Sequence, residues 1–164
     1  MTTKTSTKLG TIDEQNEIYE AFKAAANQAR AIMDSKPKIN SPEDIVKFVA
    51  PSMALADREE FHVISLDTKN RVIADDVLYK GTINQAPIRV AEVFRTAILN
   101  NATSIVIAHN HPSGDPTPSA ADVSVTEDIV KAGKLLDIEV LDHMVIGMGA
   151  EVSLRRLGLG FSSK

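Results

Sequence analysis

The sequence predicts an α/β (α+β) fold: a mixed β-sheet flanked by helices, with a helical extension at the N-terminus. Residues 104–108 form a nearly continuous apolar, largely β-branched run, which is typical of a strand buried on both faces of a sheet. Residues 61–66 and 71–79 are rich in strand-forming side chains and meet across the turn residues 67–70, which indicates a hairpin. Segments of helical periodicity separate these strands, so we expect helices on the faces of the sheet.

The composition is that of a globular domain. At 164 residues the chain is long enough for one domain with a short extension, and 43% of its residues are hydrophobic, enough for a core. No apolar run approaches the ~18 residues of a membrane span, and the first fifteen residues lack the apolar segment of a secretory signal. There is no cysteine, which excludes disulfides, thiolate metal sites and cysteine nucleophiles. These features are compatible with the cytoplasm, where we expect the protein.

The charge argues against extensive nucleic-acid binding. The formal net charge is −4, and the one adjacent basic pair in the sequence is Arg155-Arg156. Five Phe, two Tyr and no Trp leave few aromatic side chains on which bases could stack.

We divide the chain into an N-terminal tail with an amphipathic helix (residues 1–40) and a domain (residues 41–164). Residues 1–12 are polar and expected to fray. Between about residues 14 and 35, apolar side chains recur at alternating steps of four and three, as on one face of a helix. They are Ile18, Phe22, Ala25, Ala29 and Ile32. We expect this face to pack on the domain or on a second copy of the chain, which would form a homodimer.

Capping and turn residues set the other boundaries. Ser41-Pro42-Glu43-Asp44 predicts a helix start, with Ser41 as N-cap and acids in the first turn, and this helix should run to about residue 55. The further elements in chain order are a helix at 90–99, a helix at 119–136, strands at 138–141 and 144–146, and a segment of ambiguous type at 152–157.

The most informative motif is His109-Asn110-His111, directly after the buried strand. Side chains alternate faces along an extended segment, so the two imidazoles point the same way and can bind one metal ion. Asp122 follows after a Pro- and Gly-containing loop that could return a carboxylate to the same ion. Two histidines and one carboxylate leave a fourth position open, which distinguishes catalytic from structural zinc. The motif therefore predicts a hydrolase that acts through metal-activated water.

Plainer interpretations exist for several of these residues. The histidine pair could be two exposed loop residues, and Ser119 with Asp122 has the pattern of a helix capping box. The capping and metal interpretations are compatible with one another, and we favour the metal site. His62 is expected to be a strand-face residue. His143, beside Asp142, could support the site from behind, but we favour a satisfied Asp–His pair in the core.

The chain resembles the RadC family of the JAB/MPN metalloprotease-like superfamily. The resemblance covers about residues 41–158 and includes the JAMM motif, Glu…His-x-His-x(7)-Ser-x(2)-Asp. The matching runs are Glu59-Glu60-Phe61-His62-Val63-Ile64-Ser65-Leu66-Asp67, Gly81-Thr82, His109-Asn110-His111-Pro112-Ser113-Gly114-Asp115-Pro116-Thr117-Pro118-Ser119, Asp122 and Leu141-Asp142-His143.

This resemblance implies a JAB/MPN, cytidine-deaminase-like architecture and assigns roles to five residues. It implies a Zn²⁺ site of His109, His111 and Asp122, with Glu59 as general base. It also implies that the Ser119 hydroxyl stabilises the oxyanion of a tetrahedral intermediate. Spacing alone would not select Glu59, because an acidic pair at a strand start is usually just solvated.

The function implied by the resemblance is hydrolysis of a peptide or isopeptide bond in an unidentified protein or peptide. The alternative is a DNA-repair-associated accessory or binding protein whose metal site is not catalytic. Members of the family usually carry a DNA-binding helix-hairpin-helix region, which residues 1–40 do not resemble, and they tend to have Pro-Arg where this chain has Val90-Ala91. A zinc deaminase is excluded, because its usual signature includes cysteine ligands.

Overall fold

The structure is a computed structural model that describes residues 11–53, 56–81 and 88–161. Fraying was expected for residues 1–12: residues 1–10 and the end of the second helix near residue 55 fall outside these ranges, and the expectation is wrong for Thr11 and Ile12, the N-cap and first residue of a helix. The chain divides into two compact units, Met1–Lys36 and Pro37–Lys164.

The first unit contains helix α1 (Ile12–Asp34), which begins and ends within two residues of the expected helix. Thr11 caps its N-terminus: the hydroxyl of Thr11 accepts from the Glu14 backbone N–H, while the Glu14 carboxylate accepts from the Thr11 N–H. No residue of α1 is buried.

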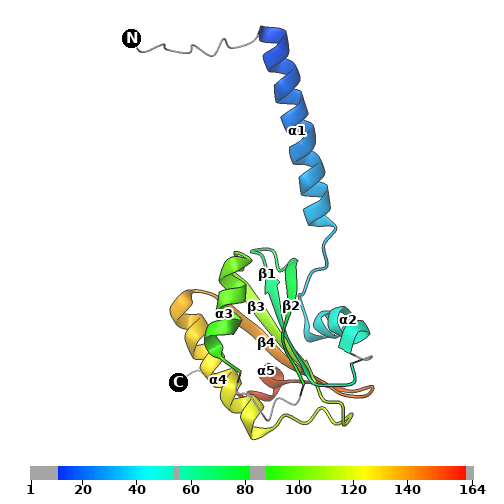
Figure 1. Cartoon of the computed structure of the whole chain (residues 1–164), viewed down its shortest axis with the longest axis vertical. Helices are drawn as coiled ribbons and strands as arrows, with labels where there is room; N and C mark the ends of the chain where they lie inside the picture. The colour runs from blue at the N-terminus through cyan, green and yellow to red at the C-terminus, as the bar shows by residue number, and fades with distance from the viewer. Residues whose placement is uncertain (1–10, 54–55, 82–87, 162–164) are drawn as a thin grey trace. The chain divides into compact units, whose positions relative to one another are not determined.

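The second unit is a five-stranded mixed sheet with helices on both faces, which confirms the expected fold class (Figure 1). The strand order is β2-β1-β3-β4-β5. β1 pairs antiparallel with β2 and β3, β3 pairs parallel with β4, and β4 pairs antiparallel with β5. The strands are β1 (Glu60–Leu66), β2 (Val72–Lys80), β3 (Ser104–Asn110), β4 (Glu139–Ile146) and β5 (Glu151–Ser153), and the helices are α2 (Pro42–Met53), α3 (Val90–Leu99), α4 (Ala120–Leu136) and α5 (Leu154–Leu157).

Strand β3 is the centre of the unit, and all seven of its residues are buried. Its alternate side chains enter two separate cores. Val106 and Ala108 pack on the side covered by α2, whereas Ile105 and Ile107 pack on the side covered by α3 and α4. Helix α4 is the crossover that the parallel pairing of β3 and β4 requires.

The expectation of two strands at 138–141 and 144–146 is wrong, because β4 continues through Asp142 and His143. Both polar side chains are buried and have partners, so they do not interrupt the strand. Asp142 accepts from the Ser153 hydroxyl at 2.7 Å and from the His143 and Arg155 backbone N–H groups. Burial raises the pKa of Asp142, although these hydrogen bonds oppose that effect.

A register shift in β4 decides which face His143 occupies. Ile105 is opposite Val140, but the next residue of β3, Val106, is opposite Asp142, so Leu141 is the extra residue of a bulge. One inserted residue exchanges the faces of all later side chains. The bulge therefore directs His143 to the side of Ile107, where α4 lies.

The segment of ambiguous type contains both structures, since β5 ends at Ser153 and α5 begins at Leu154, with the Ser153 hydroxyl accepting from the Arg156 N–H. Among the described residues, no helix has the length and apolar character needed to cross a bilayer.

Candidate metal centre

The two histidines of the motif converge at the C-terminal end of β3. His109 is the penultimate residue of β3 and is 1% exposed, and His111 is the first residue after the end of the strand. The His111 backbone N–H donates to the Ile146 carbonyl at 2.8 Å, which keeps this segment extended beside β4. Their Nε2 atoms lie 3.0 Å apart, as the period-two argument predicts.

Asp122 reaches the same point from the first turn of α4. Its Oδ1 lies 3.4 Å from His109 Nε2, and its Oδ2 lies 3.8 Å from His111 Nε2. The three residues form a group whose candidate ligand atoms all lie within 4.8 Å of one another.

The capping box at the start of α4 holds Asp122 in place. The Ser119 backbone N–H and hydroxyl both donate to Asp122 Oδ2 at 2.7 Å, and the Asp122 N–H donates to the Ser119 hydroxyl at 3.2 Å. The capping interpretation of these residues is thus confirmed, and it coexists with convergence on the histidines.

The protonation of the His111 ring follows from a carbonyl. His111 Nδ1 lies 2.8 Å from the Asp115 backbone oxygen, which can only accept a hydrogen bond. We infer that Nδ1 carries the proton in the neutral ring, the form that binds a metal, and in that form the lone pair is on Nε2.

A longer chain of hydrogen bonds fixes His109 in the same way. The Thr126 hydroxyl donates to the Asp122 backbone carbonyl, so it must accept from His143 Nδ1, 2.6 Å away. With its Nδ1 protonated, neutral His143 accepts at Nε2 from His109 Nδ1, at 2.8 Å. His109 Nε2 is then unprotonated and faces His111 and Asp122.

Burial keeps both inner histidines neutral. It lowers the pKa of His109 to about 4, because the effect of desolvation and of nearby His111 exceeds the opposing attraction of Asp122. It lowers the pKa of His143 well below the ordinary value, and the neighbouring histidines add to that effect. Neutral imidazole is the form that binds a metal.

The donor set fits a divalent cation. Two nitrogen lone pairs and a carboxylate converge, and the inferred tautomers place no proton between the nitrogens. Two imidazoles with one carboxylate suit zinc.

The side chain of Asn110, which lies between the two histidines in the sequence, connects their strand to the segment that carries Glu59. The sequence alone did not predict this role of Asn110. Its Oδ1 accepts from the Glu60 N–H at 2.7 Å, and its Nδ2 donates to the Arg58 carbonyl at 3.0 Å. These two bonds hold the residues on either side of Glu59. The half-buried Glu59 lines a cavity of about 280 Å³ together with Pro112 and Ser113, the residues that follow His111. Its neighbour Glu60 has other partners, since its carboxylate lies 3.0 Å from Lys80 Nζ.

Of the expectations for the two remaining histidines, the one for His62 is confirmed and the one for His143 is not. His62 is a strand-face residue, as expected, and lies 2.8 Å from Asp75 and 3.3 Å from Glu60; burial favours its neutral form, but these carboxylates prevail and raise its pKa. The favoured Asp–His pair at His143 is wrong for the side chains: the His143 ring contacts His109 and Thr126, whereas the Asp142 carboxylate accepts from the Ser153 hydroxyl and, at His143, from the backbone N–H. The bulge in β4 causes this difference.

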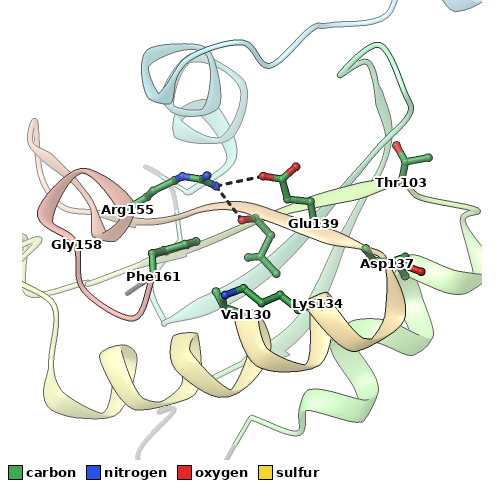
Figure 2. A pocket seen from close by; sticks show the side chains of 11 residues that line it. Thr103, Val130, Lys134, Asp137, Glu139, Arg155, Gly158 and Phe161 are labelled. Atoms are coloured by element: carbon green, nitrogen blue, oxygen red, sulfur yellow. Dashed lines mark hydrogen bonds and ion pairs between the residues drawn. The ribbon is translucent and has the colours of Figure 1, made fainter. Parts of the chain in front are cut away.

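A larger cavity, of about 770 Å³, lies at the other end of α4 and includes none of the three converging residues (Figure 2). Arg155 dominates it: its guanidinium donates to the Val140 and Leu141 carbonyls, pairs with Glu139 at 3.7 Å and lies over the Phe161 ring. Arg155 thereby joins α5 to β4.

The hydrogen-bond chain predicts a specific effect of Thr126→Val. This nearly isosteric change leaves His143 Nδ1 without an acceptor and removes the constraint on the His109 ring. We expect zinc affinity to fall about 10–100-fold, the usual effect of losing a group that orients a ligand, measured by competition with a chromophoric chelator. The control is Thr96→Val in α3, which should retain the affinity of the unmodified protein. Equal affinities in both variants would contradict the orienting role.

The comparisons with known proteins identify the family of the chain. A family model described as the RadC-like JAB domain matches residues 39–159. A UPF0758 protein of Chloroflexus aurantiacus is 43% identical over 150 residues, which cover 92% of this chain and 66% of the relative. A UPF0758 protein of Roseiflexus sp. (strain RS-1) is 46% identical over 144 residues, covering 85% and 62%. One from Methanosarcina mazei is 39% identical over 142 residues, covering 87% and 62%.

The chain thus spans less than two thirds of the length of these relatives. The family match nevertheless covers the whole sheet and every residue of the converging group. The chain therefore belongs to the RadC-like JAB domain family.

Proposed function

We propose that the chain is a zinc-dependent metallohydrolase of the JAMM type that cleaves a peptide or isopeptide bond. The observation that carries the proposal is the convergence of unprotonated His109 Nε2, His111 Nε2 and the Asp122 carboxylate. A zinc ion held by these residues would supply a Lewis acid that lowers the pKa of water toward ~7. Some members of the JAB family are metalloproteases, which supports the assignment.

Glu59 is the proposed general base. Its segment is fixed by Asn110, and it lines a cavity with the residues that follow His111, so a substrate bound in this cavity would lie against Glu59. It would take a proton from the attacking water and return it to the leaving amine.

Ser119 is the proposed hydrogen-bond donor to the oxyanion, but its hydroxyl is already engaged with Asp122. Its hydroxyl donates to Asp122 Oδ2 in the described arrangement. To donate to substrate, the hydroxyl must rotate away, while the Ser119 backbone N–H continues to hold the same carboxylate oxygen. The backbone bond therefore leaves the hydroxyl available for a second role.

The alternative is a DNA-repair accessory protein with a non-catalytic metal site, and two observations weigh against it. The group of His109, His111 and Asp122 has three members among the described residues, whereas structural zinc sites use four protein ligands. The adjacent basic pair is also engaged within the chain: Arg155 binds two carbonyls, and Arg156 lies 2.7 Å from Glu43. Little of it remains to neutralise phosphates.

Zinc content tests the ligand assignment. Asp122→Asn keeps an oxygen that can accept from Ser119 but loses the charge, so we expect affinity to fall more than the ~10–100-fold caused by changes outside the ligands. Elemental analysis after dialysis should give one zinc per unmodified chain and almost none in the variant. Asp128→Asn, an exposed carboxylate of the same helix, is the control and should keep its zinc. Equal zinc in both variants would contradict Asp122 as a ligand. Iron or manganese in the unmodified protein would contradict zinc as the metal.

Glu59→Gln separates hydrolysis from metal binding. A base need not bind the ion, so the variant should retain one zinc per chain while hydrolysis of a peptide and isopeptide panel falls by about 10²-fold or more. The control is Glu60→Gln, which alters a residue already paired with Lys80 and His62 and should stay active. An active Glu59→Gln enzyme would disprove the base. A zinc-loaded protein that cleaves no member of the panel would favour the accessory role.

A further inference from the structure

Helix α1 presents an uncovered apolar stripe. Ile18, Phe22 and Ile32 are 58%, 72% and 59% exposed, and Ala25 and Ala29 lie between them on the same face. Exposed apolar surface of this kind is unfavourable in water unless another surface covers it.

The spacing of the stripe favours a second helix as its cover. Its five positions follow one another by four, three, four and three residues, which is the narrow seam of a coiled coil rather than a broad core-facing stripe. At 23 residues, α1 is about 34 Å long, enough for three heptads. The alanines give the seam small positions that larger side chains can fill.

The distribution of charged residues along α1 favours an antiparallel orientation of the partner helix. The first half of α1 carries four carboxylates, Asp13, Glu14, Glu17 and Glu20, whereas the second half carries both cations, Lys23 and Arg30, and one carboxylate, Asp34. Two parallel copies would align acids with acids. Two antiparallel copies would bring the mainly acidic half of each helix alongside the half of the other that carries the cations, and would also oppose the helix dipoles. This places Glu17 level with the partner's Arg30, whereas Asp13 lies level with the partner's Asp34.

We propose that α1 pairs with α1 of a second copy as a two-stranded antiparallel coiled coil, so that the protein is a homodimer. In the register that sets Phe22 against the partner's Ala25, Ile18 lies against the partner's Ala29. Each large side chain then meets a small one, as dense packing requires.

The net negative charge of the helix disfavours anionic lipid or nucleic acid as its partner.

Sedimentation velocity of the full chain over a range of concentrations tests the dimer. The unmodified protein should sediment at twice its 17.7 kDa mass, and Phe22→Glu should shift the dimer dissociation constant upward at least 100-fold. Asn27→Glu adds the same charge on the opposite face of the helix and is the matched control, expected to remain dimeric. A monomeric unmodified protein, or equal dimerisation of Phe22→Glu and Asn27→Glu, would overturn the proposal. If a monomer also loses thermal stability on Phe22→Glu, the stripe covers the chain's own domain instead.

Disulfide trapping tests the orientation, since the chain has no cysteine of its own. Gln15 is opposite the partner's Ile32 in the proposed register. An oxidised mixture of Gln15→Cys and Ile32→Cys chains should form the mixed disulfide, whereas Gln15→Cys alone should not crosslink. Efficient self-crosslinking of Gln15→Cys would show a parallel pair and overturn the proposed orientation.

Discussion

The candidate metal centre depends on one directed series of hydrogen bonds. It begins at the Asp122 backbone carbonyl, which can only accept, and runs through Thr126 and His143 to His109. Because the first acceptor is a carbonyl, the direction of every later hydrogen bond is set: Thr126 donates to the carbonyl, His143 donates to Thr126, and His109 donates to His143. These hydrogen bonds are buried, so water does not compete with them, and they start and end on Asp122 and His109, two of the three converging residues. The Asp122 side chain and its backbone thus act on the centre together.

The fold brings these groups together from four separate elements. His109 lies at the end of the central strand β3, and α4, the crossover from β3 to β4, contributes both Asp122 and Thr126. Strand β4 returns parallel to β3 and contributes His143 through its bulge. The start of β1 is attached to the centre by Asn110, so the segment that carries Glu59 depends on the same strand as the two histidines. A JAB domain would therefore be hard to shorten within the sheet without losing part of the site.

Local features of the sequence were enough to predict much of this arrangement. The convergence of His109 and His111 follows from the period of a strand, and the place of Asp122 from a capping pattern, because both depend on neighbouring residues. Long-range features were not predictable in that way. His143 reaches His109 only because β4 pairs with β3 with an extra residue at Leu141, and polar side chains alone suggested a break there. Asn110 bonds to residues fifty positions away, so nothing near it in the sequence indicates its partner. Glu59 came from the family resemblance alone, for the same reason.

The most direct test of the account is the protonation of the histidine rings, read by ¹⁵N NMR at neutral pH before and after zinc is added. The metal-free protein should show His109 and His143 as neutral rings protonated at Nδ1, and His111 with a proton on Nδ1. One equivalent of zinc should then shift the Nε2 resonances of His109 and His111 strongly, while His143 keeps its proton on Nδ1 and an unligated Nε2. A proton on His109 Nε2 in the metal-free protein, or zinc ligation by His143 in place of His109, would contradict the directed chain from which the centre is derived.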